Sequence, residues 1–182
     1  MLVIFGYYLL LFIELLFFAS FSVYVIFLIY SHIKGSPYVP TKTKETLFIL
    51  KEAHLKKKQI FYELGCGDGR VVRYAVKDYK VKGFGVDINP LLILYSKFLC
   101  FLQKIKGIMF IREDIMKIDL ENANVVYLFL MPEFLKRLIP KFEKELKKNT
   151  IVISHGFKII DWQKKLYKTI QHTPFPTYFY RI

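Results

Sequence analysis

The N-terminal stretch of this chain is almost entirely apolar. Leu2–Tyr30 contains one charged residue, Glu14. An α-helix rises about 1.5 Å per residue, so about 20 apolar residues cross a hydrocarbon core of about 30 Å. The stretch exceeds this minimum. It therefore predicts one transmembrane helix, which we place at residues 1–30 and expect to anchor the rest of the chain.

The residues around this stretch favour an uncleaved, single-pass anchor. No Lys or Arg precedes it, and the apolar run is too long for the core of a cleaved signal peptide. Lys34, Lys42 and Lys44 follow it. Because positively charged flanks stay on the cytoplasmic side of a membrane, we expect the C-terminal domain to lie in the cytoplasm.

The rest of the chain is basic and rich in aromatic residues. The 28 Lys and Arg residues against 15 Asp and Glu give a net charge of +13. That charge fits a solvated lysine-rich surface, adhesion to anionic lipid headgroups, or RNA binding. The 18 Phe and 13 Tyr exclude intrinsic disorder, and two Cys with four His provide neither a disulfide scaffold nor a zinc framework. We therefore expect a basic, folded domain without a metal site.

Strand and helix patterns alternate after the anchor. Residues 31–40 are expected to form a linker, in which Pro37 and Pro40 forbid a helix, and residues 41–182 a single domain. Helices are predicted at 41–55, Arg70–Asp78, Leu91–Ile105 and Glu133–Lys147, and strands at Gln59–Leu64, Lys82–Val86, Ile108–Ile111, Asn124–Leu130, Thr150–Ser154, Lys164–Gln171 and Thr177–Ile182. This alternation predicts an α/β fold with a mostly parallel sheet and helices on both faces.

Two of these helices carry more detailed expectations. Thr41 or Thr43 is expected to cap the first one. The helix at Leu91–Ile105 is predicted to be amphipathic, because apolar residues recur at helical spacing. Its apolar stripe comprises Leu91, Leu94, Phe98, Leu102 and Ile105.

A glycine-rich segment joins the first strand of the domain to the following helix. Gly65, Gly67 and Gly69 alternate with other residues, and glycine is needed where the backbone turns tightly and lets a ligand approach without a Cβ in the way. The spacing differs from that of dinucleotide-binding loops. Glu63 lies just before the first glycine, and its carboxylate would repel a pyrophosphate but attract a cationic ligand with a free amino group.

Further candidate residues follow the next strands. Asp87 ends the second strand, where a carboxylate accepts hydrogen bonds from a ribose diol. Asp114 and Ile115 follow the third strand and suit an adenine amine and ring, and Leu130 ends the fourth. Taken singly, Glu63 also fits an exposed strand end, Asp87 a helix N-cap and Asp114 a turn. Their common position at the carboxyl ends of successive strands favours a ligand site.

These residues resemble the motifs of the class I S-adenosylmethionine-dependent methyltransferases. Glu63–Gly69 (Glu-Leu-Gly-Cys-Gly-Asp-Gly) is similar to motif I, Gly85–Asp87 to motif II and Glu113–Ile115 to motif III. The resemblance covers residues 36–182 and implies a Rossmann-like methyltransferase sheet that uses S-adenosylmethionine as co-substrate, without a metal. The residues that it places at the cofactor are Glu63, Gly65, Cys66, Gly67, Gly69, Asp87, Ile88, Asp114, Ile115 and Leu130.

A narrower group within these enzymes is also similar. Ser36–Thr41 ahead of the fold, Gly-Asp-Gly-Arg in the loop, Asn-Pro-x-Leu after Asp87 and Met-Pro before a basic helix resemble the small membrane-anchored protein-lysine methyltransferases. Mitochondrial members of that group modify the ATP synthase c-subunit and the adenine nucleotide translocase. The resemblance implies an enzyme that methylates a lysine of a protein at or near the membrane, with Pro37–Thr41 helping to cover the site.

Lysine methylation requires a neutral amine, and an apolar entrance lowers the pKa of the arriving ammonium. Tyr38, Tyr127 and Phe129 are the candidates for that lining. No catalytic residue is identified by the motifs; Tyr38 and Glu133 are the candidates for binding the amine or accepting its proton. His155 is expected to be a loop residue beyond the fifth strand rather than a base.

Other functions remain open at this level. Leu128–Pro132 lacks the Asp/Asn-Pro-Pro-aromatic pattern of enzymes that methylate adenine or glutamine amides, which argues against those substrates. An RNA methyltransferase is disfavoured because no RNA-binding module precedes the fold, whereas a small-molecule or lipid substrate would suit a site beside a membrane. A non-catalytic, membrane-anchored cofactor-binding protein is the remaining alternative. The expected partners are thus a protein substrate, membrane proteins included, and the membrane contacted by the helix and basic surface.

Overall fold

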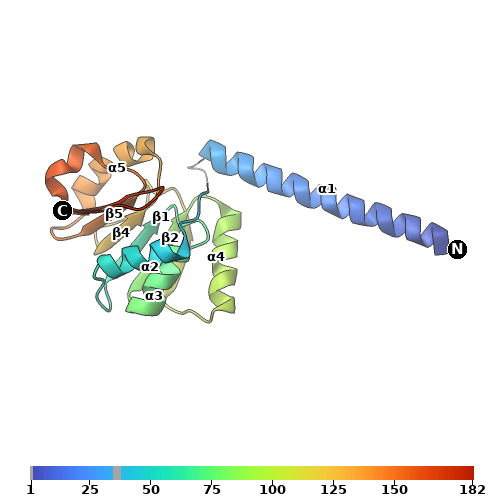
Figure 1. The fold of residues 1–182 in the computed structure, drawn as a ribbon, viewed down its shortest axis with the longest axis horizontal. Helices are drawn as coiled ribbons and strands as arrows, with labels where there is room; N and C mark the ends of the chain where they lie inside the picture. The colour runs from blue at the N-terminus through green and yellow to red at the C-terminus, as the bar shows by residue number, and fades with distance from the viewer. Residues whose placement is uncertain (1, 35–37) are drawn as a thin grey trace. The chain divides into compact units, whose positions relative to one another are not determined.

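The computed structural model of the protein describes residues 2–34 and 38–182, so the predicted linker is described only in part and Gly35–Pro37 lie outside it. The chain divides into two units, with the boundary between Pro37 and Tyr38. The first contains a single helix, α1 (Leu2–Lys34), which continues past the predicted end of the anchor at Tyr30 (Figure 1).

Within α1, one stretch is long and apolar enough to cross a membrane. It covers the 20 residues Ile4–Val23, none of whose side chains is buried. Glu14 lies near its middle. Length and composition agree with the predicted anchor, and a signal sequence near an N-terminus has the same properties.

The second unit is built on one seven-stranded sheet in the order β3-β2-β1-β4-β5-β7-β6. The first five strands are parallel neighbours, and β7 runs antiparallel between β5 and β6. This arrangement confirms the predicted mostly parallel sheet. The strands are β1 (Ile60–Leu64), β2 (Lys82–Asp87), β3 (Ile108–Arg112), β4 (Val125–Leu128), β5 (Ile151–His155), β6 (Leu166–Ile170) and β7 (Thr177–Arg181).

Helices cover both faces of this sheet, as predicted. One apolar core holds side chains of α2 (Thr43–Glu52), α3 (Arg70–Tyr79) and α4 (Pro90–Leu102) against the strands, and Figure 1 shows these three helices together. The other core holds α5 (Pro132–Glu145) and the 3₁₀ helix η1 (Ile160–Lys165). Because β1 to β4 are parallel, their carboxyl ends lie at one edge of the sheet, where the loops that follow them meet.

The central strand β4 shows why its sequence reads as a continuous apolar run. Val125 and Tyr127 face one core, whereas Val126 and Leu128 face the other. All four are buried. A parallel strand covered on both faces needs apolar residues at every position, so alternation is lost.

The predicted apolar stripe of α4 is not the face that packs on the sheet. The buried residues of the helix are Leu92, Ile93 and Ser96. Leu91, Leu94, Phe98 and Leu102 are instead exposed by 46–66%. The helix is apolar around nearly its whole circumference, so spacing alone could not distinguish the two faces.

The predicted capping of the first helix of the domain is also wrong. Lys42 is the N-cap of α2, and no side chain caps that end. The hydroxyl of Thr41 instead lies 3.1 Å from the phenol oxygen of Tyr127 in the domain interior. A long-range hydrogen bond therefore takes the hydroxyl that local sequence assigns to capping.

Candidate active site

The glycine loop, residues 65–69, leaves β1 and enters α3. Gly65, Gly67 and Gly69 have φ angles of 71°, 53° and 68°. This left-handed conformation strains residues with a Cβ, and a Cβ on Gly69 would lie only 2.5 Å from the Phe110 ring. The turn and the close packing together explain why the segment alternates glycine with other residues.

Asp87 ties this loop to the end of β2. Its Oδ2 accepts a hydrogen bond of 2.9 Å from the backbone N–H of Gly67, and its Oδ1 accepts one of 2.8 Å from Asn89. Asn89, not Asp87, is the N-cap of α4, because its side chain accepts from the N–H groups of that helix. A carboxylate has about four acceptor sites, so Asp87 retains capacity for the hydroxyls of a sugar.

Three carboxylates crowd around the loop: Glu63, Asp68 and Asp87. Glu63 is 5% exposed, so its interpretation as an exposed strand end is wrong. Its Oε2 accepts a hydrogen bond of 2.8 Å from the N–H of Val72 in the first turn of α3. Burial, with the charges of Asp68 and Asp87, raises the pKa of Glu63 well above its usual range, and burial also raises the pKa of Asp87. The negative charges of Asp68 and Asp87 at the loop also favour a positively charged ligand there.

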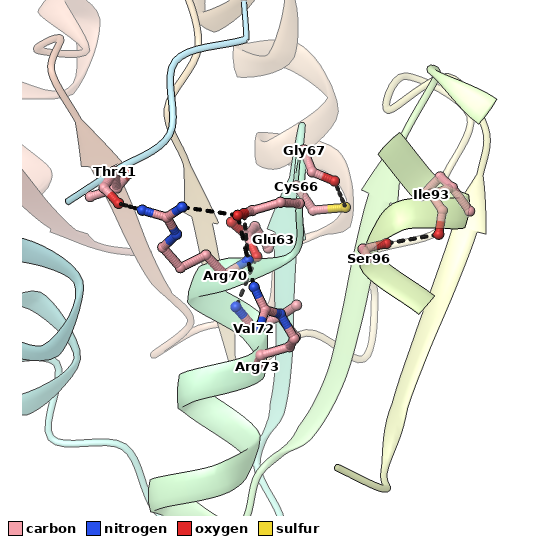
Figure 2. Close-up of polar contacts among 10 residues, drawn as sticks. Thr41, Glu63, Cys66, Gly67, Arg70, Val72, Arg73, Ile93 and Ser96 are labelled. Carbon is pink, nitrogen blue, oxygen red and sulfur yellow. Dashed lines mark hydrogen bonds and ion pairs between the residues drawn. The ribbon is translucent and has the colours of Figure 1, made fainter. Parts of the chain in front are cut away.

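Asp68 joins the loop to the chain segment that precedes α2. Its carboxylate accepts hydrogen bonds of 3.0 Å from the backbone N–H and from the guanidinium of Arg70. The same carboxylate lies 3.8 Å from the guanidinium of Arg73. Arg70 also donates a 2.9 Å hydrogen bond to the backbone oxygen of Thr41, as Figure 2 shows. Sequence reasoning passed over Asp68 and Arg70 as functional residues, although the Gly-Asp-Gly-Arg pattern contains both.

Tyr38 lies over the middle of the loop. A Cβ on Gly67 would lie 2.7 Å from its ring, so the phenol packs directly on that glycine. Burial, followed by the charge of Asp68, raises the pKa of Tyr38 to about 12. The phenol therefore keeps its proton at neutral pH and is a poor proton acceptor. Tyr38 thus covers the middle of the glycine loop, and Pro37, the first residue of the segment that the resemblance places over the site, lies outside the described residues.

Tyr127 and Phe129, the other predicted lining residues, lie at different depths. Tyr127 is 2% exposed, and burial raises the pKa of its phenol. Phe129 is half-buried, and its ring centroid lies 4.6 Å from that of His155 and 5.2 Å from that of Phe175. Tyr127 is thus part of the core beneath the site rather than an open entrance.

His155 is the last residue of β5 and is fully buried, so its prediction as a loop residue is wrong. Its Nδ1 lies 2.8 Å from the hydroxyl of Thr177, and its Nε2 lies 3.8 Å from the carboxylate of Glu45. Burial, with the nearby His172, lowers the pKa of His155 to about 4. The imidazole is therefore neutral at pH 7.

Four of the remaining predicted residues follow the strands β3 and β4. Asp114 is half-buried and accepts a 2.9 Å hydrogen bond from the N–H of Met116, so it also forms the predicted turn; Ile115 beside it is half-buried. Leu130 is buried against Gly65, at 2.8 Å from the position of a Cβ on that glycine. Glu133 is exposed in the first turn of α5.

Two predicted residues beside the loop have apolar surroundings. Cys66 is buried, and burial raises the pKa of its thiol well above the usual range, so it is not a reactive thiolate. Ile88 is half-buried directly after Asp87. Among residues 2–34 and 38–182, no group of three or more His, Cys, Asp or Glu side chains is arranged to hold a metal ion.

Comparisons with known proteins identify the family of this chain. The family model described as the ANTKMT methyltransferase domain matches residues 63–166. A protein-lysine N-methyltransferase of Saccharolobus islandicus (strain REY15A) is 38% identical over 140 residues, which cover 74% of this chain and 85% of the relative. The human lysine N-methyltransferase of the ATP synthase c-subunit is 30% identical over 130 residues, covering 69% of this chain but only 54% of the relative.

The domain is also similar to a solved structure. An RNA methyltransferase from Salinibacter ruber, in complex with S-adenosyl-L-homocysteine, superposes with a TM-score of 0.75 and 27% identity. The match covers 79% of this chain and 94% of that one. The Rossmann-like methyltransferase sheet is therefore confirmed. With the family model spanning more than half of its length, this chain belongs to the ANTKMT methyltransferase family of S-adenosylmethionine-dependent protein-lysine N-methyltransferases.

Proposed function

We propose that this protein transfers a methyl group from S-adenosylmethionine to the ε-amine of a lysine in a protein that lies at or within a membrane. The observation that carries the proposal is the hydrogen bond between Asp87 and Gly67, which joins a sugar-binding carboxylate to a glycine loop at adjacent strand ends. Membership of the family supports lysine as the acceptor, and the apolar helix α1 supports a location at a membrane.

The residues at this edge of the sheet fit the cofactor. The positive-φ loop at Gly65–Gly69 offers backbone without side chains, Asp87 offers acceptors for a ribose, and Asp114 with Ile115 follows the next strand where an adenine would be bound. The bound cofactor supplies an activated methyl group on a positively charged sulfur. Nearby carboxylates stabilise that charge, because opposite charges in a partly desolvated site attract strongly.

The lysine amine must arrive without its proton. Aromatic residues near the strand ends, among them Tyr38 over the loop and the half-buried Phe129 after β4, disfavour the charged ammonium by desolvation. Tyr38 keeps its own proton at neutral pH, so its role is to close over the loop and orient the amine. Positioning the amine in line with the methyl group accounts for most of the rate acceleration in such a transfer.

Membrane attachment follows from α1. Its apolar stretch Ile4–Val23 would cross the bilayer, and the lysines after the helix favour a cytoplasmic domain. The human relative acts, by its name, on the c-subunit of ATP synthase. A membrane-protein substrate for this chain extends that chemistry to an enzyme tethered beside its target.

Two measurements test the proposal. The full chain in detergent should bind S-adenosylhomocysteine in calorimetry, and with labelled S-adenosylmethionine and membranes of its source it should label a product that protease destroys. Labelled lysine in a hydrolysate identifies the acceptor. A product destroyed by ribonuclease, an outcome that the Salinibacter relative suggests, would refute lysine transfer, and a product extracted into organic solvent would point to a lipid.

Asp87→Ala is the matching inactive variant, and Glu121→Ala is its control. Both remove one carboxylate, but Glu121 is exposed in the turn before β4 and away from the loop. Labelling that persists undiminished in Asp87→Ala would separate methyl transfer from the proposed site.

A further inference from the structure

The exposed side of α4 carries a continuous apolar surface. We call it the α4 face, and its members are Leu91, Leu94, Tyr95, Phe98, Phe101 and Leu102. Each is exposed by 46–79%, with Phe101 the most exposed. They recur at spacings of three and four residues, so they form one stripe opposite the buried Leu92, Ile93 and Ser96. An exposed apolar patch of this kind on a folded domain marks a surface that contacts something apolar.

The chain segment that carries the α4 face has charges of one sign. From Ile88 to Arg112 the sequence contains no Asp or Glu. Lys97 lies at the flank of the stripe and Lys104 and Lys106 follow the helix, and all three are exposed. Met109 of the edge strand β3, in the same segment, is exposed by 58%. An apolar stripe with Phe and Leu, in a segment whose charged residues are all basic, is the pattern of a helix that lies in a membrane interface.

We propose that the α4 face inserts into the interfacial layer of the bilayer that α1 crosses, with the flanking lysines on anionic lipid headgroups. The membrane is a better occupant than a second copy or a partner protein for a physical reason. Lysine stems lie along an apolar surface while their ammonium groups reach phosphates, at roughly 1 kcal/mol per residue near an anionic surface. A protein interface depletes lysine from its buried centre and would need carboxylates opposite these charges.

The link to α1 strengthens this contact, and this step, like the proposal, rests on the proposed membrane attachment. Only the residues between Lys34 and Thr43 join α1 to α2. A fully extended chain reaches about 3.3–3.6 Å per residue, so the domain is held within roughly 30 Å of the anchor. Confinement at that distance makes a weak interfacial contact effectively intramolecular.

Docking through α4 has a consequence for the active site. Leu91, the first member of the α4 face, lies close to Asp87 in the sequence, and Asn89 lies between them. The side chain of Asn89 accepts hydrogen bonds from backbone N–H groups of α4, and its backbone N–H donates to the carboxylate of Asp87. The α4 face therefore begins beside the predicted ribose-binding residue. A docked α4 would hold this edge of the sheet at the bilayer surface, where a lysine close to a transmembrane segment is exposed.

The test uses the full chain in vesicles and an environment-sensitive fluorophore on one cysteine. In a Cys100→Ser background, Phe98→Cys places the label on the α4 face, and Lys136→Cys places it on the exposed side of α5 as the matched control; Cys66 is buried and escapes labelling. Vesicles of phosphatidylcholine with phosphatidylglycerol carry a quencher on their acyl chains. We expect quenching at position 98 to exceed that at 136 by about two-fold or more, and to fall in phosphatidylcholine alone and at high salt.

Several outcomes would overturn docking. Equal quenching at both positions excludes an oriented contact, and so does quenching at 98 that ignores lipid charge and salt. Protection of position 98 from aqueous iodide that grows with protein concentration, without lipid quenching, would assign the α4 face to a second copy. S-adenosylhomocysteine binding by the same labelled proteins checks that they are folded. A labelled protein that binds this ligand and methylates lysine, yet shows no lipid contact, refutes docking and leaves the proposed function standing.

Discussion

The carboxylate of Asp87 accepts a 2.9 Å hydrogen bond from the backbone N–H of Gly67, so the end of β2 holds the middle of the glycine loop. The same carboxylate accepts the N–H of Asn89, the N-cap of α4. One side chain thus fixes the loop after β1 and the helix after β2. We infer that ligand binding at one of these places depends on the geometry of the other.

Asp87→Ala should weaken S-adenosylhomocysteine binding by about 10- to 100-fold. The substitution removes the acceptor for a ribose and releases the N–H of Gly67, and a hydrogen bond to a charged group contributes about 1.5–3 kcal/mol. Calorimetry on the full chain measures the loss. Asp87→Asn keeps an acceptor oxygen, so its affinity for S-adenosylhomocysteine should lie between that of the parent and that of Asp87→Ala. Affinity equal to that of the parent in both variants would show that Asp87 does not contact the ligand.

Gly67→Ala tests how tightly Tyr38 covers the loop. The new Cβ would lie 2.7 Å from the Tyr38 ring, and alanine also strains the φ of 53°. We expect lower affinity for S-adenosylhomocysteine, with partial recovery in the double variant Tyr38→Ala/Gly67→Ala, because removing the ring relieves the clash but not the strain. Strictly additive losses in this double-mutant cycle would contradict a direct contact.

Gly107→Ala is the matched control for backbone strain. Its φ is 89°, but the nearest atom to a Cβ there is Cγ1 of Val76, at an ordinary 3.7 Å. The variant should lower the free energy of unfolding by about 1 kcal/mol and leave ligand affinity unchanged. A similar fall in affinity would mean that strain anywhere in the domain, rather than contact with Tyr38, explains the Gly67 result.

Arg70→Lys should loosen the segment that covers the loop. The guanidinium donates both to the backbone oxygen of Thr41 and to Asp68, and a lysine ammonium cannot reproduce that fork. We expect faster hydrogen exchange at residues 38–42 and a lower kcat. Arg112→Lys, at an exposed position that ends β3, is the control. Unchanged exchange at 38–42 in Arg70→Lys would show that other contacts hold this segment.

The order of elements and the strand-end residues could be predicted because local chemistry determines them. A glycine turn such as Gly65–Gly69 is required by its own backbone angles, and an apolar run such as Val125–Leu128 is required by burial on both faces. The hydrogen bond between Tyr127 and Thr41 could not be predicted, since the two residues are distant in sequence. The burial of Trp162 in η1 could not be predicted from hydrophobic periodicity in the sequence, because that helix is short and irregular.

The predictions of the buried face of α4 and of the position of His155 were wrong for different reasons. The residues of α4 are apolar on both sides, and only the position of the sheet decides which side is buried. His155 is polar and follows an apolar strand, so its sequence indicates a loop. The antiparallel pairing of β5 with β7, where His155 lies opposite Thr177, extends the strand over it.

His155 should make stability depend on pH in a defined direction. Burial lowers its pKa to about 4, whereas an unfolded histidine titrates near pH 6.5, as expected for an unperturbed imidazole. Between these values the unfolded chain binds a proton that the folded imidazole does not, so the free energy of unfolding falls as the pH falls from about 6.5 to about 4. Facing groups that act on this imidazole are Glu45, His172 and Thr177.

Denaturant unfolding of the parent and of His155→Gln at pH 7 and pH 4.5 isolates this contribution. Glu63 and Asp87 have raised pKa values and oppose it, because the folded protein then holds protons that the unfolded chain loses at mildly acidic pH; their effect is common to both proteins. We expect the loss of stability on acidification to be smaller in His155→Gln. His54→Gln, at an exposed histidine, is the control, and a shallower slope in that variant but not in His155→Gln would assign the effect to the surface instead.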